Sequence, residues 1–164
     1  MITTRRRASK IVIGSAAVLA SGAALARAPE IFLSEGGIFG SPWTHAANGF
    51  DVVAFHGLAA DDDPVPGDPA FSAAHKGANW LFADQENLDA FVAAPEKFAP
   101  QYGGYCAWAV ARNKLAKGDP AAWHVHNDKL YLNVNKRIRS QFLANIERDI
   151  SNADKNWPAV LDTK

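Results

Sequence analysis

A chain of 164 residues with 48% hydrophobic content fits one domain with its own core. Its 17 basic and 17 acidic side chains balance, which gives no support for nucleic-acid binding. One cysteine excludes an internal disulfide, and the sequence has no repeat, phosphate loop, nucleotide fingerprint or Ser-His-Asp arrangement. The chain therefore carries no recognisable catalytic constellation.

Residues 1–26 have the pattern of a cleavable export signal. Basic side chains at positions 5–7 and 10 precede an apolar run over 11–26, which ends in an A-x-A cleavage site before Arg27. The arginines resemble a twin-arginine signal, but Ala8-Ser9 replaces the expected apolar pair, so Sec export stays open. The run is too short for a membrane span.

Cleavage of this signal defines the expected mature protein. It would remove four of the 17 basic residues and no acidic one, leaving a net charge of −4. No cysteine stands at the cleavage point, which argues against a lipoprotein. We expect a periplasmic or otherwise exported chain without a membrane span.

Residues 27–47 are predicted to form an apolar arm laid over a domain that spans 48–164. A free tail would expose several large apolar side chains to water at a cost in free energy. These side chains are Ile31, Phe32, Leu33, Ile38, Phe39 and Trp43.

Apolar spacing and turn residues predict the elements of the domain. In chain order they are a turn and strand (48–56), a loop (59–68), paired strands (71–76 and 78–83), a helix (84–94), a short helix (105–112), a loop (113–122), a hairpin (123–133), a helix (135–150) and a terminal helical turn (151–161). Asp84 is a plausible N-cap for the first helix. The predicted fold is a single α+β domain, a small antiparallel sheet packed by two or three helices.

The predicted hairpin has Asn127-Asp128 at its tip. A two-residue turn pairs His124 with Tyr131 and places His124 and His126 together on the face opposite the core. An H-x-H pair on a strand can hold zinc or copper through two imidazoles. The alternative is two solvated imidazoles beside Tyr131.

Cys106 follows Gly103-Gly104 and opens the predicted short helix. A thiol near a helix N-terminus feels a positive partial charge, which favours the thiolate and lowers its pKa. The thiolate is both a nucleophile and a metal ligand. The alternative is a small buried hydrophobe among aromatic side chains.

Several motifs resemble the bacterial YHS-domain proteins, and more narrowly the exported branch often labelled YHS domain-containing (seleno)protein. The motifs are Gly49–Phe55, His75–Ala83, Pro95–Ala107, Gly118-Asp119-Pro120, Trp123, Lys129–Asn133, Ala153-Asp154 and Trp157-Pro158. They cover nearly all of the chain after the signal. The resemblance implies metal binding, because the family occurs beside metal pumps and in metal-related proteins.

Comparison with the family's motifs changes the expected ligand set. Ala54, Ala83 and Asn87 stand where metal-handling YHS domains typically carry thiols. His75 matches the family's His-x-Gly element, whereas His56 stands where this branch more often has an aromatic residue. The resemblance therefore implies a copper or zinc site built from the side chains that remain, and Cys106 is the only thiol among them. The candidate ligands are Cys106, His75, Asp51 and His56, with His124 and His126 as a weaker pair.

The sequence is compatible with two main functions and with a third, less specific one. The first is a non-catalytic, exported metal-binding or metal-accessory protein whose partner is a metal ion. The second is a periplasmic thiol redox protein that uses Cys106 and needs a partner thiol protein, because the chain has no second cysteine. The third is a structural or interaction domain.

Overall fold

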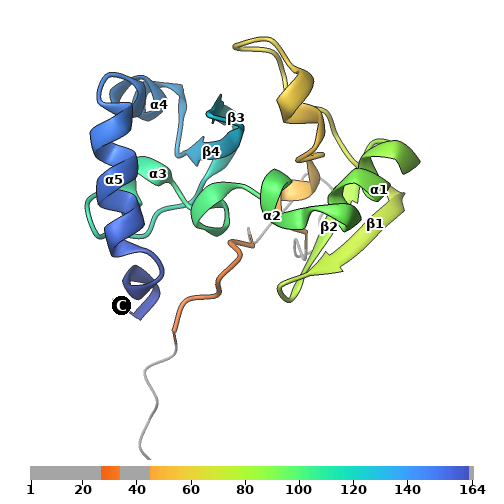
Figure 1. Ribbon diagram of the computed structural model, residues 1–164, viewed down its shortest axis with the longest axis horizontal. Helices are drawn as coiled ribbons and strands as arrows, with labels where there is room; N and C mark the ends of the chain where they lie inside the picture. Colours follow the sequence, from red (N-terminus) through yellow and green to blue (C-terminus); the bar gives the residue numbers. More distant parts are fainter. Residues whose placement is uncertain (1–26, 34–44, 163–164) are drawn as a thin grey trace, which may run out of the picture.

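Two antiparallel hairpins, each covered by its own helices, form the molecule (Figure 1). This computed structural model describes residues 27–33 and 45–162. The predicted export signal lies outside the described residues, as do Ile38, Phe39 and Trp43 of the predicted arm. Within the described ranges no helix has the length and apolar content needed to cross a membrane.

The first hairpin and its helices follow the 3₁₀ turns η1 (Ala47–Gly49) and η2 (Ala54–Gly57). They are β1 (Asp68–His75), β2 (Ala78–Phe82), α1 (Gln85–Ala93) and the one-turn α2 (Pro95–Phe98). The predicted strands and first helix are confirmed. The carboxylate of Asp84 accepts the Asn87 N–H at 2.9 Å, as an N-cap should.

The second hairpin lies among the C-terminal helices. The elements are the turn η3 (Gln101–Gly104), α3 (Ala107–Val110), β3 (Asp119–His126), β4 (Lys129–Asn133), α4 (Lys136–Leu143), α5 (Ile146–Asn156) and the turn η4 (Ala159–Asp162). The predicted register is confirmed, with His124 opposite Tyr131 and Val125 opposite Leu130. Asn127 and Asp128 adopt positive φ values of 50° and 58°, as a two-residue turn requires.

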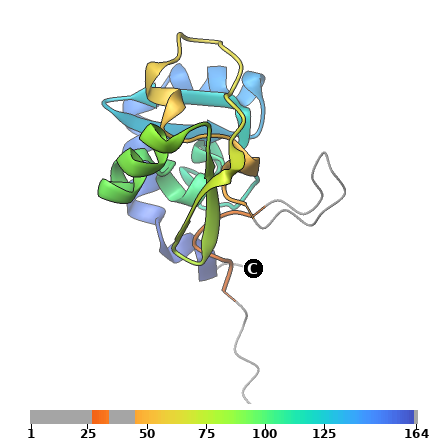
Figure 2. The same ribbon diagram turned by 90° about the vertical axis from the view of Figure 1, so that its right-hand side faces the viewer.

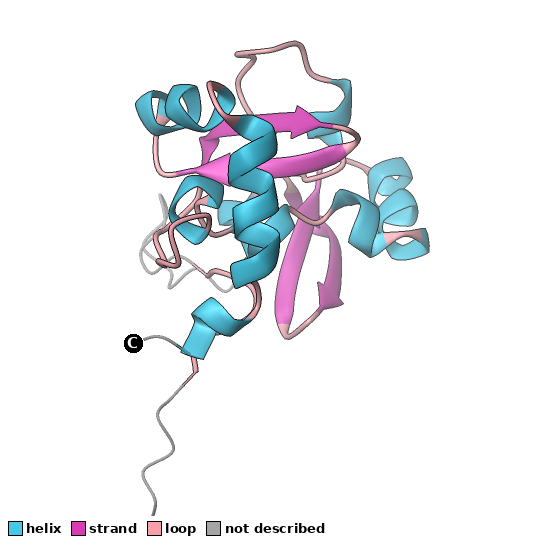
Figure 3. Ribbon diagram, turned by 60° about the vertical axis from the view of Figure 1, so that its left-hand side comes forward, coloured by secondary structure: helices cyan, strands magenta, loops and turns pink. Residues whose placement is uncertain are grey.

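The mixed α+β class is confirmed, but the strands form two separate two-stranded sheets. Figure 3 shows the two hairpins running in different directions. One core cluster joins them, because Trp80 and Phe82 of β2 share it with Leu132 of β4. The opposite face of the second hairpin, with Tyr131, packs against Phe142 of α4 in another cluster. Both faces of the second hairpin are therefore largely covered, and Ala121 and Lys129 are its exposed strand residues.

The prediction of a turn followed by a strand over 48–56 is wrong in its strand. This stretch forms η1 and η2, and Ala47 and Asn48 have φ values of 49° and 53°. The side chain of Asp51 accepts backbone N–H groups two and three residues later, which favours a turn over a strand.

The predicted helix over 135–150 is also wrong, because it divides into α4 and α5. Asn145 leaves the helical region, with φ of −142° and ψ of 39°. The break redirects the chain so that α5 runs alongside α3, in blue at the left of Figure 1. The short helix predicted over 105–112 is only α3, with Cys106 at its N-cap position.

The described part of the arm, residues 27–33, lies on the domain. Ala28 and Ile31 are buried, and the Phe32 ring lies 5.3 Å from that of Tyr105. The Phe32 N–H donates to the Gly103 carbonyl at 2.8 Å. The arm therefore contacts the glycine turn that precedes Cys106.

Candidate functional site

Asp51 is a buried carboxylate whose oxygens are fully used by the protein. It is 0% exposed, and Oδ1 accepts the N–H groups of Val53 at 2.8 Å and Ala54 at 3.2 Å. Oδ2 accepts the Ala83 N–H at 2.8 Å and Asn87 Nδ2 at 2.7 Å. These donors compensate for the desolvation of the carboxylate. Asp51 thus ties the η2 turn to the end of β2 and the start of α1.

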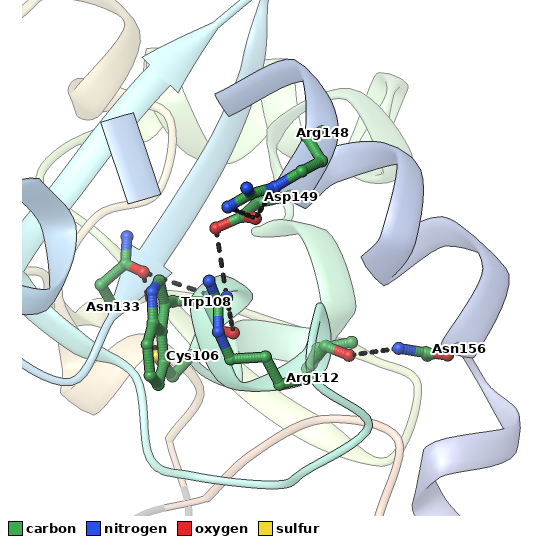
Figure 4. A network of polar contacts seen from close by, with 8 residues as sticks. Cys106, Trp108, Arg112, Asn133, Arg148, Asp149 and Asn156 are labelled. Atoms are coloured by element: carbon green, nitrogen blue, oxygen red, sulfur yellow. Dashed lines mark hydrogen bonds and ion pairs between the residues drawn. The ribbon is translucent and has the colours of Figure 1, made fainter. Parts of the chain in front are cut away.

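Cys106 is 1% exposed, and its thiol donates to Asn133 Oδ1 at 3.8 Å (Figure 4). Burial raises the pKa of the Cys106 thiol, although the N–H groups at the start of α3 act in the opposite direction. The predicted lowering of this pKa is therefore wrong, because the buried site disfavours the charged thiolate. The geometry favours the alternative in which Cys106 is a small buried hydrophobe.

Beside Cys106, a buried carboxylate that the sequence did not single out joins α3 to α5. Asp149 is 1% exposed and lies 3.1 Å from Nη1 of Arg112 and 3.1 Å from Nη2 of Arg148. The Arg112 guanidinium also stacks 3.8 Å from the centroid of the Trp108 ring. Figure 4 shows these groups converging between the two helices. The only sequence signal for them is the i, i+4 spacing of Trp108, on α3, and Arg112, in the turn that follows it.

His75 and His56 each lie beside an exposed carboxylate. His75 Nε2 is 3.3 Å from Glu96 Oε1, and His56 Nδ1 is 3.3 Å from Asp128 Oδ1. The geometry of neither contact satisfies a hydrogen bond, so His75 Nε2 and both ring nitrogens of His56 are buried without a hydrogen-bond partner. Burial lowers the pKa of His56, and the nearby Asp128 offsets part of that effect.

The imidazoles of the second hairpin are half-buried, not solvated. The rings of His124 and His126 stack with centroids 6.3 Å apart, and His126 Nε2 lies 2.8 Å from Glu147 Oε1. Burial lowers the pKa of His124, and the charge on its neighbour His126 acts in the same direction. Among the six predicted ligands, the structure records a direct contact only between these two.

The other four predicted metal ligands each make contacts in a different part of the protein. Asp51 and Cys106 are satisfied inside the protein, and His56 and His75 contact different carboxylates. In the described ranges no group of three or more His, Cys, Asp or Glu side chains is close enough to hold one metal ion. The ligand set implied by the resemblance is therefore not assembled in this conformation.

A polar cleft of about 190 Å³ lies where the arm meets the glycine turn. It is lined by the arm, the β1–β2 turn, α2, η3 and the end of α5. Figures 1 and 2 show the described arm, in orange, passing close to these segments. Charged and aromatic side chains dominate the lining: Glu30, Lys76, Glu96, Tyr102, Asp154 and Trp157.

Hydrogen bonds fix the walls of this cleft. Tyr102 has φ of 56°, and its hydroxyl donates to Asp154 Oδ1 at 2.7 Å. Burial, followed by the hydrogen bond to Asp154, raises the pKa of Tyr102, so the phenol stays neutral and donating. Lys76 Nζ lies 2.9 Å from Glu30 and 3.2 Å from Glu96. No sequence pattern indicated a cleft here, although the motifs that resemble YHS proteins contain Glu96, Tyr102, Asp154 and Trp157.

Comparison with known proteins adds no assignment. No protein-family model, curated protein sequence or solved structure matches the chain. The structure defines a mixed α+β domain with a polar cleft, and the resemblance to YHS proteins rests on motif residues alone.

Proposed function

We propose that this chain is a non-catalytic, exported binding protein whose ligand site is the cleft between the arm, the glycine turn and α5. The observation that carries the proposal is the cleft itself, which is built from five separate segments and lined by charged and aromatic side chains. A concave site with a few convergent polar groups is the usual form of a small-molecule site.

The walls of the cleft are held in place before any ligand arrives. The Phe32 N–H to Gly103 carbonyl bond fixes the arm, and the Tyr102 hydroxyl to Asp154 bond fixes the turn against α5. Rigid walls reduce the entropy that binding must overcome. Asp51 and Cys106, by contrast, already use their polar atoms within the protein.

The binding proposal can be tested by NMR screening of the purified chain with small fragments of every charge type. We expect saturable shifts of the Trp157 indole N–H and the Gly103 amide with a subset of fragments. The variant Trp157→Leu, followed at the Gly103 amide because it has no indole at this position, should lose the shift, whereas Trp108→Leu, outside the cleft, should keep both shifts. No binding by any fragment, or binding only at residues outside the cleft, contradicts the proposal.

Export is the part of the proposal that rests on the N-terminal sequence. Residues 1–26 carry the basic cluster, apolar run and A-x-A site of a cleavable signal. Mass analysis should find a mature chain starting near Arg27 in the periplasm, and an intact Met1 in the cytosol would contradict export. Replacing Arg5 and Arg6 by Lys should block export only if the signal is of the twin-arginine type.

Metal binding is a second candidate function, which the buried nitrogens of His56 favour. Both lack hydrogen-bond partners, and Nδ1 is 3.3 Å from Asp128 Oδ1. Two ligands on a tetrahedral zinc ion would be about 3.3 Å apart for bonds near 2.0–2.1 Å. Lys97 lies 3.5 Å from the other oxygen of Asp128 and would have to move away, because its charge opposes a cation.

Metal analysis after equilibration with copper or zinc distinguishes a site at His56 and Asp128 from the site with Cys106 that the resemblance implies. We expect His56→Gln to lose bound metal and Cys106→Ser to retain it, because Cys106 is 1% exposed and its thiol contacts Asn133. Loss in Cys106→Ser alone would contradict a site at His56. A wild-type chain that takes up neither ion at micromolar concentration would exclude metal binding.

A further inference from the structure

The geometry of the cleft points to a small organic ammonium ion, a primary amine in its protonated form, as the ligand that it binds. This inference rests on the proposed binding function and names the chemical class of the ligand. Four features carry it: the excess of negative charge in the cleft, an unpaired carboxylate, an adjacent aromatic ring and the end of a helix.

The charge of the lining selects a cation. Three carboxylates, Glu30, Glu96 and Asp154, face the cleft with a single ammonium, that of Lys76. Two negative charges remain in excess. A cleft lined by one sign of charge attracts ligands of the opposite sign.

Lys76 shows that these walls already hold an ammonium group. Its Nζ lies 2.9 Å from Glu30 Oε1 and 3.2 Å from Glu96 Oε1. Glu30 and Glu96 thus each have an ion-pair partner in Lys76. The third carboxylate, Asp154, has no ion pair among the described residues and is the position left for the ligand.

The surroundings of Asp154 suit an ammonium group with an apolar tail. The Tyr102 hydroxyl gives its proton to Asp154, so its lone pairs remain to accept an N–H from a ligand. Trp157 follows three residues after Asp154 and also lines the cleft, where its ring can contact a cation or a hydrocarbon chain. Asp154 lies in the last turn of α5 and Trp157 is its C-cap residue, and the C-terminal end of a helix dipole favours positive charge.

The spacing of the carboxylates favours an organic cation over a metal ion. In the described ranges no three acidic or imidazole side chains are close enough to share one ion. A divalent metal needs several oxygen ligands at about 2.0–2.6 Å from a single point. A cleft of about 190 Å³ with its three carboxylates spread over three segments fits a ligand of several heavy atoms instead.

Four probes of defined charge test the inference by NMR on the purified chain at constant ionic strength. They are n-butylammonium chloride, n-butanol, sodium butyrate and calcium chloride. We expect only n-butylammonium to shift the Trp157 indole and Gly103 amide signals saturably. Its affinity should fall as salt is raised, because the charges of the cleft are partly screened.

Asp154→Asn keeps an acceptor for the Tyr102 hydroxyl and removes the charge, so its fold should be maintained. We expect it to weaken n-butylammonium binding about fivefold, the effect of one partly exposed charge. Glu96→Gln gives a second test within the cleft and should also weaken binding. The matched control Asp63→Asn, on an exposed loop outside the cleft, should leave binding unchanged.

The outcomes separate this inference from the binding function on which it rests. Equal binding of butanol or butyrate, tighter binding of calcium, or unchanged affinity in both cleft variants would overturn the ammonium assignment and leave a ligand-binding cleft. If none of the four probes binds, the ammonium assignment is also wrong. The binding function itself then fails only if the fragment screen finds no ligand of any charge.

Discussion

Gly103 and the carbonyl of Glu30 occupy adjoining space so closely that a side chain at position 103 cannot fit. A Cβ built on Gly103 would lie 1.7 Å from the Glu30 oxygen. The glycine also has φ of 61°, a conformation that residues with a Cβ resist. The arm and the glycine turn are therefore mutually dependent, although 73 residues separate Gly103 from Glu30 in the chain.

Gly103→Ala should destabilise the protein by about 3–4 kcal/mol, since it combines left-handed backbone strain with displacement of the arm. Gly77→Ala is the matched control, because Gly77 has φ of 75° but nothing within 4 Å of its Cβ position. That control should cost only about 1 kcal/mol. Urea unfolding measures both values, and equal losses would show that the arm contact contributes nothing.

Asp51→Ala should destabilise the fold by about 3–5 kcal/mol, because it leaves four N–H donors without their acceptor. Asn87→Ala removes only one of these donors and should cost about 1–2 kcal/mol. Denaturant unfolding of both variants gives the comparison. A loss of metal in Asp51→Ala with unchanged stability would instead identify Asp51 as a ligand.

Cys106 should react slowly with iodoacetamide in the folded protein, because its thiol is 1% exposed and burial raises its pKa. The rate should increase sharply through the urea unfolding transition, and Cys106→Ala provides the blank. Rapid alkylation of the folded chain at about pH 7 would show a reactive thiolate and restore the redox hypothesis.

His56 should make the protein less stable in acid. Burial lowers its folded-state pKa below the ordinary histidine value of about 6.5, so the unfolded chain binds a proton more readily. This contribution is complete above about pH 6.5 and is lost as the pH falls through the folded-state pKa. His56→Gln should reduce the difference between urea midpoints measured near pH 7.5 and near pH 5.5. An identical difference in wild type and variant would contradict the assignment, and His124→Gln is the parallel test on the second hairpin.

The sequence by itself predicted the elements whose determinants lie within a few residues of one another. The Asn127-Asp128 turn and the apolar alternation beside it specified the register that pairs His124 with Tyr131. Asp84 marked the start of α1 because its N-cap bond reaches only to Asn87. Such interactions form within one turn or one hairpin, so local pattern is sufficient to find them.

Tertiary structure decided which polar side chains are used within the fold and which line the cleft. Asp51 has an ordinary turn sequence around it, and only its hydrogen bonds with Ala83 and Asn87, 32 and 36 residues away, join it to distant segments. The cleft also depends on a long-range contact, because the Tyr102 hydroxyl donates to Asp154, 52 residues later in the chain. The pKa of Cys106 followed burial and not the helix start, because desolvation depends on every segment packed around the thiol.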